Sequence, residues 1–581
     1  MRQGSATDPV FTWREPQPTQ VPHDKLPAVG DALTVTAWCH TEVARSEGLQ
    51  PLVSRWAPRP SFDAFSACDA SRVGGLDTRG FYGAIFDGRF IYYCPIRHRE
   101  DRRTVHGCVL RYDTHRDFRD HDAYRAYDAG HTDGLVTKGF YGAAFDGRHL
   151  FFIPRDDGHV HHSRFLRYDT CGDFCDGASW RAHDAQHPHS FQGAAFDGRY
   201  IYCCPGYTKP VSAPFGDDEA SGVVMRLDTA GDFGDPASYR TFDAGSLGAD
   251  AVSFDGAAFD GRHVYFVPLQ TGTVLRYDTA AAFDERSAWR AYDATPLGMG
   301  GNVGAVYDGR HLYFVPFGHG RMVRLDTAGD IGDRDAWEVH DAGGTPGIGP
   351  TGYKGGFFDG RFVYYVPFRG PVPESSPRSP YHGTYLRYDT TCPFAAAESW
   401  QAADAGLTDG LATTAFTAGA TDGRFLYAAP WRGDLDGGWM HGRILRYDTV
   451  GTEAAFSLRF SDYGHNGGLC AALPGPTFLI NTPAGARSVS SHQALPPGRH
   501  YLVGLYDGAS LALFVDGERV ATREARGEVH DAAVDLAIGH IASARFEGSI
   551  ESAEVHGVAR DDEWIRARAV GQESSRHRRL R

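Results

Sequence analysis

The sequence predicts an all-β protein built around a seven-bladed β-propeller. Two short motifs recur along the chain at intervals that suit a blade. The tripeptide Asp-Gly-Arg starts at seven positions (87, 146, 197, 260, 308, 359 and 422), and an Arg-Tyr-Asp-Thr or Arg-Leu-Asp-Thr copy follows each one. The first six units then reach a segment similar to "SWRAYDA". Repeats of about 50 residues that each hold four short strands are typical of a propeller.

Each unit divides into four antiparallel strands, as the second unit illustrates. The stretch "YGAAFDG" alternates and ends in Asp-Gly, a strong hairpin signal because a type I′ turn needs positive φ at both central residues. The stretch "RHLFFIP" is the partner strand, which its Pro ends. "RFLRYDT" and "WRAHDA" are the third and fourth strands. Because Asp-Gly-Arg and Arg-x-Asp-Thr occur in every unit, we interpret them as residues that build blades.

The seventh unit lacks its own fourth strand after Asp448. A separate copy of that strand, "FSACDA" at Phe65–Ala70, stands in front of the first unit and aligns with "WRAYDA". We therefore expect the N-terminal segment to supply the fourth strand of blade 7. This closure leaves no open sheet edge between the first and last blades.

Residues outside the propeller predict a second β domain. "ALTVTAWCH" (Ala32–His40) and "LQPLVSRW" (Leu49–Trp56) resemble the opening strands of a laminin-G-like, concanavalin-type jelly roll. "HYLVGLYDGASLALFVDGERVA" (His500–Ala521) and "RFEGSIESAEVHGVARDDEWI" (Arg545–Ile565) resemble its later hairpins, closing strand and final turn. The resemblance implies one sandwich split by the propeller, with Val35 and Trp38 in a core shared with the later strands.

The expected domain boundaries follow from these assignments. Residues 1–24 form an N-terminal arm, 25–63 and 451–570 the two parts of the sandwich, 64–450 the propeller, and 571–581 a basic tail. The resemblance supplies the fold only, because the calcium and sugar residues of laminin-G-like domains vary too much to be placed here.

Composition narrows the classes of function. The 581-residue chain carries a formal charge of −15, and its basic residues are spread evenly except in "RHRRLR", which argues against nucleic acid as a partner. No apolar run approaches the length of a membrane span, and no signal peptide is recognisable. Cysteines within apolar strands suggest a reducing cytoplasm. The sequence contains no phosphate-loop motif, so we expect no nucleotide cofactor. The oligomeric state is not predicted.

Loop lengths distinguish the two faces of the propeller. The spacing from the third-strand Asp to the fourth-strand Asp is 15 in all six uninterrupted units, whereas the second-to-third connection varies from 18 to 31. The fourth-to-first connection also varies, and these two variable loops lie on one face. Loops on a rigid scaffold carry recognition, so we expect function on this variable face and the sandwich on the other.

A histidine precedes the third strand at one register in five neighbouring blades. The five are His106, His162, His319, His382 and His441, while blades 3 and 4 have Ser221 and Thr271. Imidazoles could hold a divalent metal (Fe, Mn, Cu, Zn or Ca are not distinguished), as in carotenoid oxygenases and pectate-type lyases, propeller enzymes that look similar in outline. The alternative is a turn-shaping residue, because the third strand lies about 10 Å farther from the axis than the first.

Two further sets of residues are candidates on the variable face. Arg97, Arg369 and Arg432 follow the second strand and could bind a carboxylate or phosphate; the alternative is a solvated arginine. The residues nearest the axis are Tyr82, Tyr141, Gln192, Asp255, Val303, Lys354 and Thr417. Lys138 and Lys354 are two of only four lysines, and a lysine can act as base or nucleophile.

The predicted catalytic residues are therefore Tyr82, Lys138, Tyr141, Asp255 and Lys354, with Gln192 joining the three arginines in substrate binding. Together these patterns favour an enzyme that acts on a small anionic or polyhydroxylated ligand in the axial funnel. Lyase, oxygenase and isomerase chemistry, with or without a His-bound metal, all remain open. The alternative is a non-catalytic module that binds a glycan or a protein.

Overall fold

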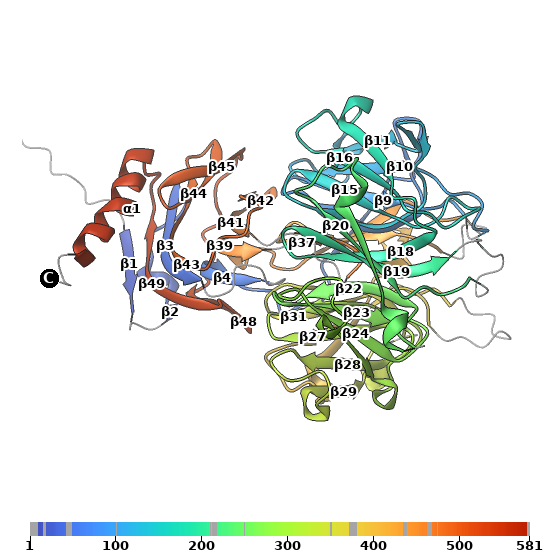
Figure 1. Cartoon of the computed structure of the whole chain (residues 1–581). Coiled ribbons are helices and arrows are strands. Elements are labelled where there is room, and N and C mark those ends of the chain that lie inside the picture. The colour runs from blue at the N-terminus through green and yellow to red at the C-terminus, as the bar shows by residue number, and fades with distance from the viewer. Residues whose placement is uncertain are drawn as a thin grey trace, which may run out of the picture.

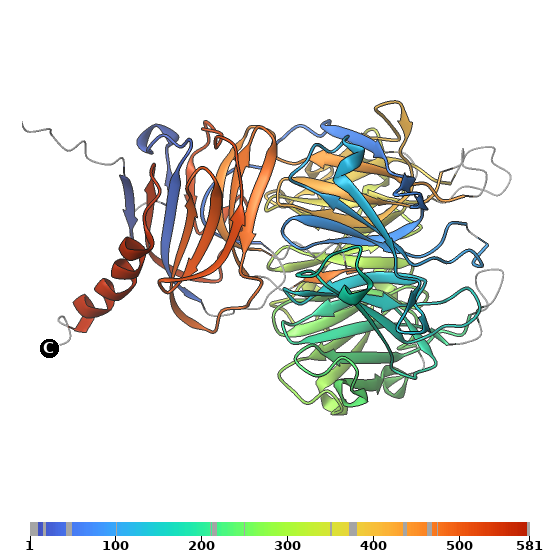
Figure 2. The same cartoon turned by 90° about the horizontal axis from the view of Figure 1, so that it is seen from above.

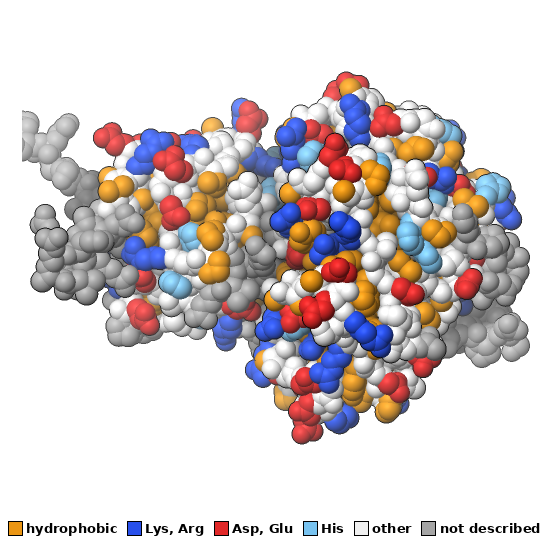
Figure 3. All heavy atoms as spheres, viewed as in Figure 1, with side chains coloured by type: hydrophobic (Ala, Val, Ile, Leu, Met, Phe, Trp, Pro, Cys, Tyr) orange, Lys and Arg blue, Asp and Glu red, His pale blue; other side chains and the backbone are white. Residues whose placement is uncertain are grey.

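The computed structural model describes residues 10–15, 19–41, 49–99, 101–208, 211, 218–248, 250–348, 351–370, 380–433, 439–461, 468–472 and 475–577, with side chains as far as residue 570. It contains two β-rich bodies that lie against each other, a propeller and a sandwich (Figures 1 and 2). Acidic and basic side chains are interspersed over the viewed face of both (Figure 3).

The propeller has seven four-stranded blades, and consecutive strands within each blade pair antiparallel. Blades 1 to 3 are β8 (Phe81–Phe86), β9 (Phe90–Pro95), β10 (Cys108–Asp113), β11 (Tyr124–Asp128); β14 (Phe140–Phe145), β15 (His149–Pro154), β16 (Arg164–Asp169), β17 (Trp180–Asp184); and β18 (His189–Phe196), β19 (Tyr200–Thr208), β20 (Val223–Asp228), β21 (Tyr239–Asp243).

Blades 4 to 6 follow the same plan. They are β22 (Phe254–Phe259), β23 (His263–Pro268), β24 (Thr273–Asp278), β25 (Trp289–Asp293); β26 (Asn302–Tyr307), β27 (His311–Pro316), β28 (Arg321–Asp326), β29 (Trp337–Asp341); and β30 (Tyr353–Phe358), β31 (Phe362–Pro367), β32 (Thr384–Asp389), β33 (Trp400–Asp404).

Blade 7 closes the ring as the repeat count predicts. It comprises β36 (Phe416–Thr421), β37 (Phe425–Pro430), β38 (Arg443–Asp448) and, from the N-terminal side, β5 (Phe65–Asp69). β5 pairs antiparallel with β38 from Arg443↔Asp69 to Tyr447↔Phe65. One antiparallel sheet thus combines strands from both ends of the propeller segment.

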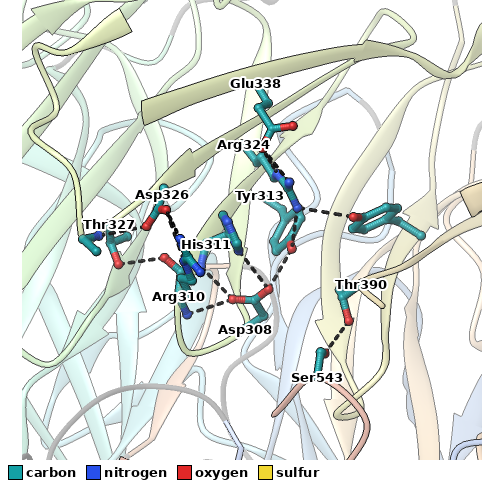
Figure 4. Close-up of polar contacts among 12 residues, drawn as sticks. Asp308, Arg310, His311, Tyr313, Arg324, Asp326, Thr327, Glu338, Thr390 and Ser543 are labelled. Carbon is teal, nitrogen blue, oxygen red and sulfur yellow. Dashed lines mark hydrogen bonds and ion pairs between the residues drawn. The ribbon is translucent and has the colours of Figure 1, made fainter. Parts of the chain in front are cut away.

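The recurring motifs hold each blade together, as blade 5 shows (Figure 4). The Asp308 carboxylate accepts backbone N–H bonds from Arg310 and His311 at 2.8 and 2.6 Å, and the Tyr313 hydroxyl donates to it at 2.7 Å. Arg310 then forms an ion pair with Asp326 of the third strand at 2.7 Å. The same Arg–Asp pair recurs in all seven blades. The motifs are therefore structural, as the sequence predicts.

Short accessory elements decorate the blades. A 3₁₀ turn joins the third and fourth strands in six blades, which explains their constant spacing: η2 (His121–Ala123), η3 (Gly177–Ser179), η4 (Pro236–Ser238), η6 (Arg286–Ala288), η8 (Arg334–Ala336) and η10 (Ala397–Ser399). Three two-stranded ribbons lie in the loops entering blades 1, 2 and 7: β6 (Arg72–Val73) with β7 (Leu76–Asp77), β12 (His131–Thr132) with β13 (Leu135–Val136), and β34 (Leu407–Thr408) with β35 (Leu411–Ala412). Further 3₁₀ turns are η1 (His23–Lys25), η5 (Ala244–Leu247), η7 (Thr295–Leu297) and η9 (Ala342–Gly344).

The second body is a sandwich of two six-stranded sheets that draws on both ends of the chain. One sheet has the order β1 (Val10–Arg14), β49 (Gly548–His556), β3 (Leu33–Thr41), β43 (Gly498–Tyr506), β44 (Ser510–Val515), β45 (Glu518–Glu524). The other has β2 (Gln20–Val21), β46 (Leu536–Ile538), β4 (Gln50–Trp56), β39 (Ala454–Ser461), β41 (Gly475–Thr482), β42 (Gly485–Ser490). A small hairpin, β47 (His540–Ile541) and β48 (Ala544–Arg545), precedes β49.

Three details of the sandwich differ from the prediction. Residues 10–14 and 20–21 are strands β1 and β2 of the sandwich rather than parts of a free arm. The predicted basic tail begins inside helix α1 (Asp562–His577), whose first turn is held by a 2.8 Å bond from the Trp564 N–H to the Asp561 carboxylate. Val35 lies in the sandwich core, but Trp38 packs on the outer face under α1, because residues three apart on a strand point to opposite sides.

The sandwich lies on the propeller face that carries the Asp-Gly-Arg turns, opposite the variable loops. Ser488 donates a hydrogen bond to the Gly88 carbonyl at 3.3 Å, and Ser543 to the Gly360 carbonyl at 3.2 Å. Arg424 of blade 7 donates to Asn481 of the sandwich at 2.8 Å. The predicted placement of the sandwich is confirmed by these contacts.

One segment of the sandwich enters the propeller, which the sequence analysis did not predict. Between β39 and β41, β40 (Ala471–Ala472) pairs parallel with the first strand of blade 2 at Ala144 and Phe145. We call the described residues 468–472 the plug. All five are buried. The Gly468 carbonyl accepts the Ala257 N–H of blade 4 at 3.0 Å, so the plug reaches the axis from the sandwich side.

Candidate functional site

The first strand of every blade bends where it meets the axis, and this bend presents the axial side chains. In blade 2 the pairing with the second strand shifts register between Phe140 and Ala143. Gly142 there has φ +82°, a left-handed conformation that glycine adopts without a steric penalty. The plug also needs this glycine, because a Cβ would lie 1.8 Å from the Leu469 carbonyl oxygen. The glycine repeated at this position therefore forms the bulge, while the axial residue before it, Tyr141 in blade 2, differs between blades.

Three of the predicted axial residues meet in one buried network, which we call the axial triad: Tyr141, Asp255 and Lys354. The Tyr141 hydroxyl donates to Asp255 Oδ2 at 2.5 Å, and Lys354 Nζ donates to the Tyr141 hydroxyl at 2.8 Å. Lys354 Nζ also lies 3.5 Å from Asp255 Oδ2. The three side chains come from blades 2, 4 and 6 and are at most 2% exposed.

Aromatic rings surround the lysine of the triad. Lys354 Nζ lies 4.7 Å from the ring centre of Tyr82, 5.1 Å from that of Phe317 and 5.6 Å from that of Phe368. Ring faces attract an ammonium ion, so they offset part of the cost of burying this charge. Tyr82 and Phe317 are half-buried, so the cluster reaches solvent on the variable face.

Burial sets the protonation of the triad. Burial raises the pKa of Asp255 above its usual range, although Lys354 and the Tyr141 hydroxyl favour the carboxylate. Burial and the neighbouring Asp255 raise the pKa of Tyr141 well above its usual value, so this hydroxyl stays protonated. Asp255 Oδ1 is buried and accepts no hydrogen bond from the described residues. The triad thus pairs a phenol donor with a carboxylate that has spare acceptor capacity.

The remaining axial residues act as links between blades. Gln192 accepts from Arg155 Nη1 at 2.8 Å and donates to the Phe254 carbonyl at 2.7 Å. Thr417 donates to the Phe81 carbonyl at 2.7 Å. Val303 is fully buried in the hydrophobic cluster around the axis. Gln192, placed by the sequence among substrate-binding residues, therefore has both ends of its amide occupied.

A second set of residues near the axis escaped the sequence analysis. It is the residue that follows the proline of each second strand, in order Ile96, Arg155, Gly206, Leu269, Phe317, Phe368 and Trp431. Five of these seven belong to one apolar cluster with Tyr141 and Leu469 of the plug. Arg155 is the only charged member, and its Cζ lies 4.6 Å from the Tyr141 ring centre. The sequence could have revealed Arg155, because this position after the second-strand proline holds an apolar residue or glycine in the other six blades.

The five predicted metal-binding histidines do not converge, since each bonds the backbone of its own blade. The Nε2–H donates to a carbonyl in the loop that enters the first strand: Gly80 for His106, Lys138 for His162, Gly300 for His319, Gly352 for His382 and Thr414 for His441, at 2.8–3.1 Å. In all but His382, Nδ1 accepts the N–H two residues later at 3.1–3.3 Å.

This geometry does not fit a metal centre. In four of the five histidines the backbone engages both ring nitrogens, so neither nitrogen keeps a free lone pair for a metal ion. The residues described by the structure contain no group of three or more His, Cys, Asp or Glu side chains placed to bind an ion. In blade 3, Ser221 accepts the Val223 N–H at 3.0 Å, the same turn bond that His forms elsewhere.

The other predicted residues lie apart from the triad. Arg97 is 1% exposed and pairs with Asp156 at 3.2 Å. Arg432 donates to the Tyr381 hydroxyl at 3.0 Å, and Arg369 is exposed. Lys138 is half-buried in the loop that enters blade 2, and a Cβ on Gly130 would lie 2.9 Å from its Cε. Among the described residues, no hydrogen bond or ion pair of the triad involves Lys138 or Arg369.

Comparison with known proteins supports the sandwich. Residues 446–566 match the family model of the concanavalin A-like lectin/glucanases superfamily. No curated protein matches the sequence. Among the described residues, no helix is long and apolar enough to cross a membrane.

The solved structures that the chain matches are distant in sequence. A chain of the nidogen/laminin complex is 14% identical and has a TM-score of 0.30, covering 51% of this chain and 94% of that one. The Cps50 (Swd1) β-propeller domain of Myceliophteria thermophila is 11% identical with a TM-score of 0.38 (64% and 98%). The dihydro-heme d1 dehydrogenase NirN in complex with DHE is 15% identical with a TM-score of 0.31 (66% and 78%). By its own strand pairings and the match of residues 446–566, the protein is a seven-bladed β-propeller combined with a concanavalin-type sandwich.

Proposed function

We propose that the propeller is an enzyme domain that binds a small polyhydroxylated or anionic ligand at the axial triad and transfers protons to and from it. The buried Lys354–Tyr141–Asp255 network carries this proposal. A buried ion pair is weak support for stability, because desolvation offsets its attraction. The other blades fill the same positions with residues such as Val303 and Thr417, so the ring itself does not require charge there. Ionisable groups perturbed by burial gather at functional sites.

The triad divides into a proton donor and a proton acceptor. Tyr141 is protonated and lies 2.8 Å from the Lys354 ammonium, which would stabilise the phenolate as the proton leaves. Burial raises the pKa of Asp255, which makes its carboxylate a stronger base. Its Oδ1 accepts no hydrogen bond from the described residues. An acid and a base held side by side suit lyase and isomerase reactions. The oxygenase alternative gains no support, because the five histidines bond the backbone.

A second candidate is a binding module without chemistry. The match of residues 446–566 to a superfamily of lectins and glucanases favours it. In that case the sandwich binds a glycan, and the triad only joins blades 2, 4 and 6.

The test compares binding with turnover. Galacturonate and its oligomers are suitable probes, since they carry both hydroxyl groups and a carboxylate. We expect binding by calorimetry, and product formation detected by the absorbance of an unsaturated sugar or by NMR. Tyr141→Phe should reduce turnover about 100-fold or more while binding is kept, in line with the usual contribution of acid–base catalysis. Lys138→Met is the matched control. Binding without turnover would favour the second candidate, and no binding would make the triad structural.

A further inference from the structure

Charged side chains extend from the axial triad toward blades 1 to 3, on the variable face. Arg97, Arg102 and Arg155 surround the carboxylate of Asp156, with nitrogen-to-Oδ2 distances of 3.2, 4.0 and 3.5 Å. We call these four residues the arginine cluster. Each is at most 6% exposed. Arg102 adopts a left-handed φ of +62°, which costs free energy in a residue other than glycine. Arg102 also pairs with Asp218 at 2.5 Å, so the three guanidinium groups share two carboxylates.

Arg155 is the member of the cluster that also contacts the triad. Its guanidinium stacks over the Tyr141 ring, while Lys354 bonds the hydroxyl of the same tyrosine. Gln192, which accepts the one hydrogen bond that Arg155 donates to a described residue, fixes its orientation. Arg155 therefore stands beside the proposed proton donor.

The donors of Arg155 are mostly unused within the described part of the chain. A guanidinium has five N–H groups. Nη1 bonds Gln192 at 2.8 Å, and Nε is buried without a hydrogen bond, because Asp156 lies 3.5 Å away. Among the described residues, Nε is thus the Arg155 donor that is buried without an acceptor. A buried polar group left without a partner is costly, so it usually marks a missing ligand or water.

Unused donors and an unused acceptor thus lie on two sides of Tyr141. Arg155 offers N–H groups, and Asp255 Oδ1 offers a lone pair. A molecule that satisfies both must accept bonds at one end and donate one at the other. A carboxylate matches the planar fork of an arginine, and a hydroxyl matches the carboxylate oxygen of Asp255. A hydroxy acid combines the two groups.

We propose that Arg155 binds the carboxylate of a sugar acid or similar hydroxy acid, and so selects acidic ligands for the axial triad. This inference rests on the proposed function, because it names the ligand class of that same site. Asp156, flanked by Arg97 and Arg102, holds the arginine cluster in place when no ligand is bound. In the competing interpretation the Arg155–Gln192 and Arg155–Asp156 contacts only fix the loops.

The experiment measures discrimination rather than affinity alone. Glucuronate and its neutral amide, glucuronamide, are titrated into the full-length protein by calorimetry. We expect the wild type to prefer glucuronate about 10- to 100-fold, the usual effect of a hydrogen bond to a charged group. Arg155→Leu should reduce this ratio to near one and leave the affinity for glucuronamide unchanged. Leucine is chosen because Leu269 occupies the equivalent position in blade 4.

Two further variants make the result decisive. Arg369→Leu, which removes an exposed arginine of blade 6, should keep the full preference. Arg155→Lys keeps the charge and loses the fork, so its ratio should be intermediate, and it serves if Arg155→Leu does not fold. Equal affinity of the wild type for both probes would overturn the role of Arg155 and leave the proposed function standing. Binding of neither probe would overturn both.

Discussion

Removing the ammonium of the axial triad should destabilise the propeller in a pH-dependent manner. Lys354→Met keeps an unbranched side chain among the rings of Tyr82, Phe317 and Phe368. It removes the ion-pair partner of Asp255, which is only 2% exposed. Breaking a buried pair by removing one member costs about 3–5 kcal/mol, because a charge stays buried without compensation. The lost contact with the aromatic rings adds about 1–2 kcal/mol.

The sign of the pH dependence follows from Asp255. Burial raises its pKa in the folded protein, whereas in the unfolded chain the pKa is about 3.9. Between these two values the folded state binds more protons than the unfolded state, so stability falls as the pH rises through this window. Without Lys354, which favours the carboxylate, the upper end of the window moves to higher pH. The variant should therefore approach the wild type in mild acid and fall furthest behind above neutrality.

Urea denaturation followed by tryptophan fluorescence at about pH 5 and about pH 8 tests this expectation. Asp255→Asn in the Lys354→Met background removes the buried charge and should recover much of the loss at the higher pH. Lys138→Met is the control for a lysine outside the triad, and we expect a change within about 0.5 kcal/mol. A Lys354→Met variant as stable as the wild type at both pH values, or a loss independent of pH, would refute the reasoning.

Three other predictions concern the turn histidines and the plug. His319→Ala should lower the free energy of unfolding by about 1–2 kcal/mol through its lost turn bonds and leave the metal content by elemental analysis unchanged. The pKa of His106 is lowered to about 3, mainly by burial, while an unfolded histidine titrates near pH ~6.5, so the unfolded state binds more protons in between and stability falls as the pH drops through this window. NMR titration should show His106 still unprotonated at about pH 5, where an unperturbed histidine is largely protonated. Gly142→Val should expel the plug, because its Cβ would meet the Leu469 carbonyl oxygen. Gly309→Ala, with φ +99° and open space around it, should cost about 1–3 kcal/mol of backbone strain in denaturation measurements.

The fold was predictable because its determinants are repeated. The Asp-Gly-Arg turn and the third-strand Asp occur in every blade, so strand boundaries that are ambiguous in one copy are defined by the other six. The closing strand was predictable for the same reason, since Phe65–Asp69 is a copy without a unit of its own. Trp38 was misplaced because it was assigned to the same core as Val35, although residues three apart on a strand point to opposite faces. The plug could not be foreseen, because residues 468–472 carry no repeated pattern and their contacts lie hundreds of residues away.

The candidate site was predictable in part, and the histidines show where the reasoning failed. A side chain repeated at one register is selected by the repeated backbone around it, and His106 and its equivalents fill the same turn. Their replacement by Ser221 and Thr271 was the available sign, because a hydroxyl can also accept a backbone N–H. The residues of the triad were predicted for the opposite reason. Tyr141, Asp255 and Lys354 occupy a position whose residue differs between most blades, so the shared backbone does not explain them.

The architecture connects the sandwich to the triad. Tyr141, Asp255 and Lys354 belong to blades 2, 4 and 6, so their 2.5–2.8 Å bonds form only when these blades hold their places around the ring. The plug fixes two of the three, because it pairs with the first strand of blade 2 and bonds the Ala257 N–H of blade 4, two residues after Asp255. Leu469 at its tip shares a cluster with Tyr141. A shift of the sandwich would thus disturb the Tyr141–Asp255 bond first, while the Arg155 side of the site, held by Gln192 and Asp156 within the propeller, would stay in place.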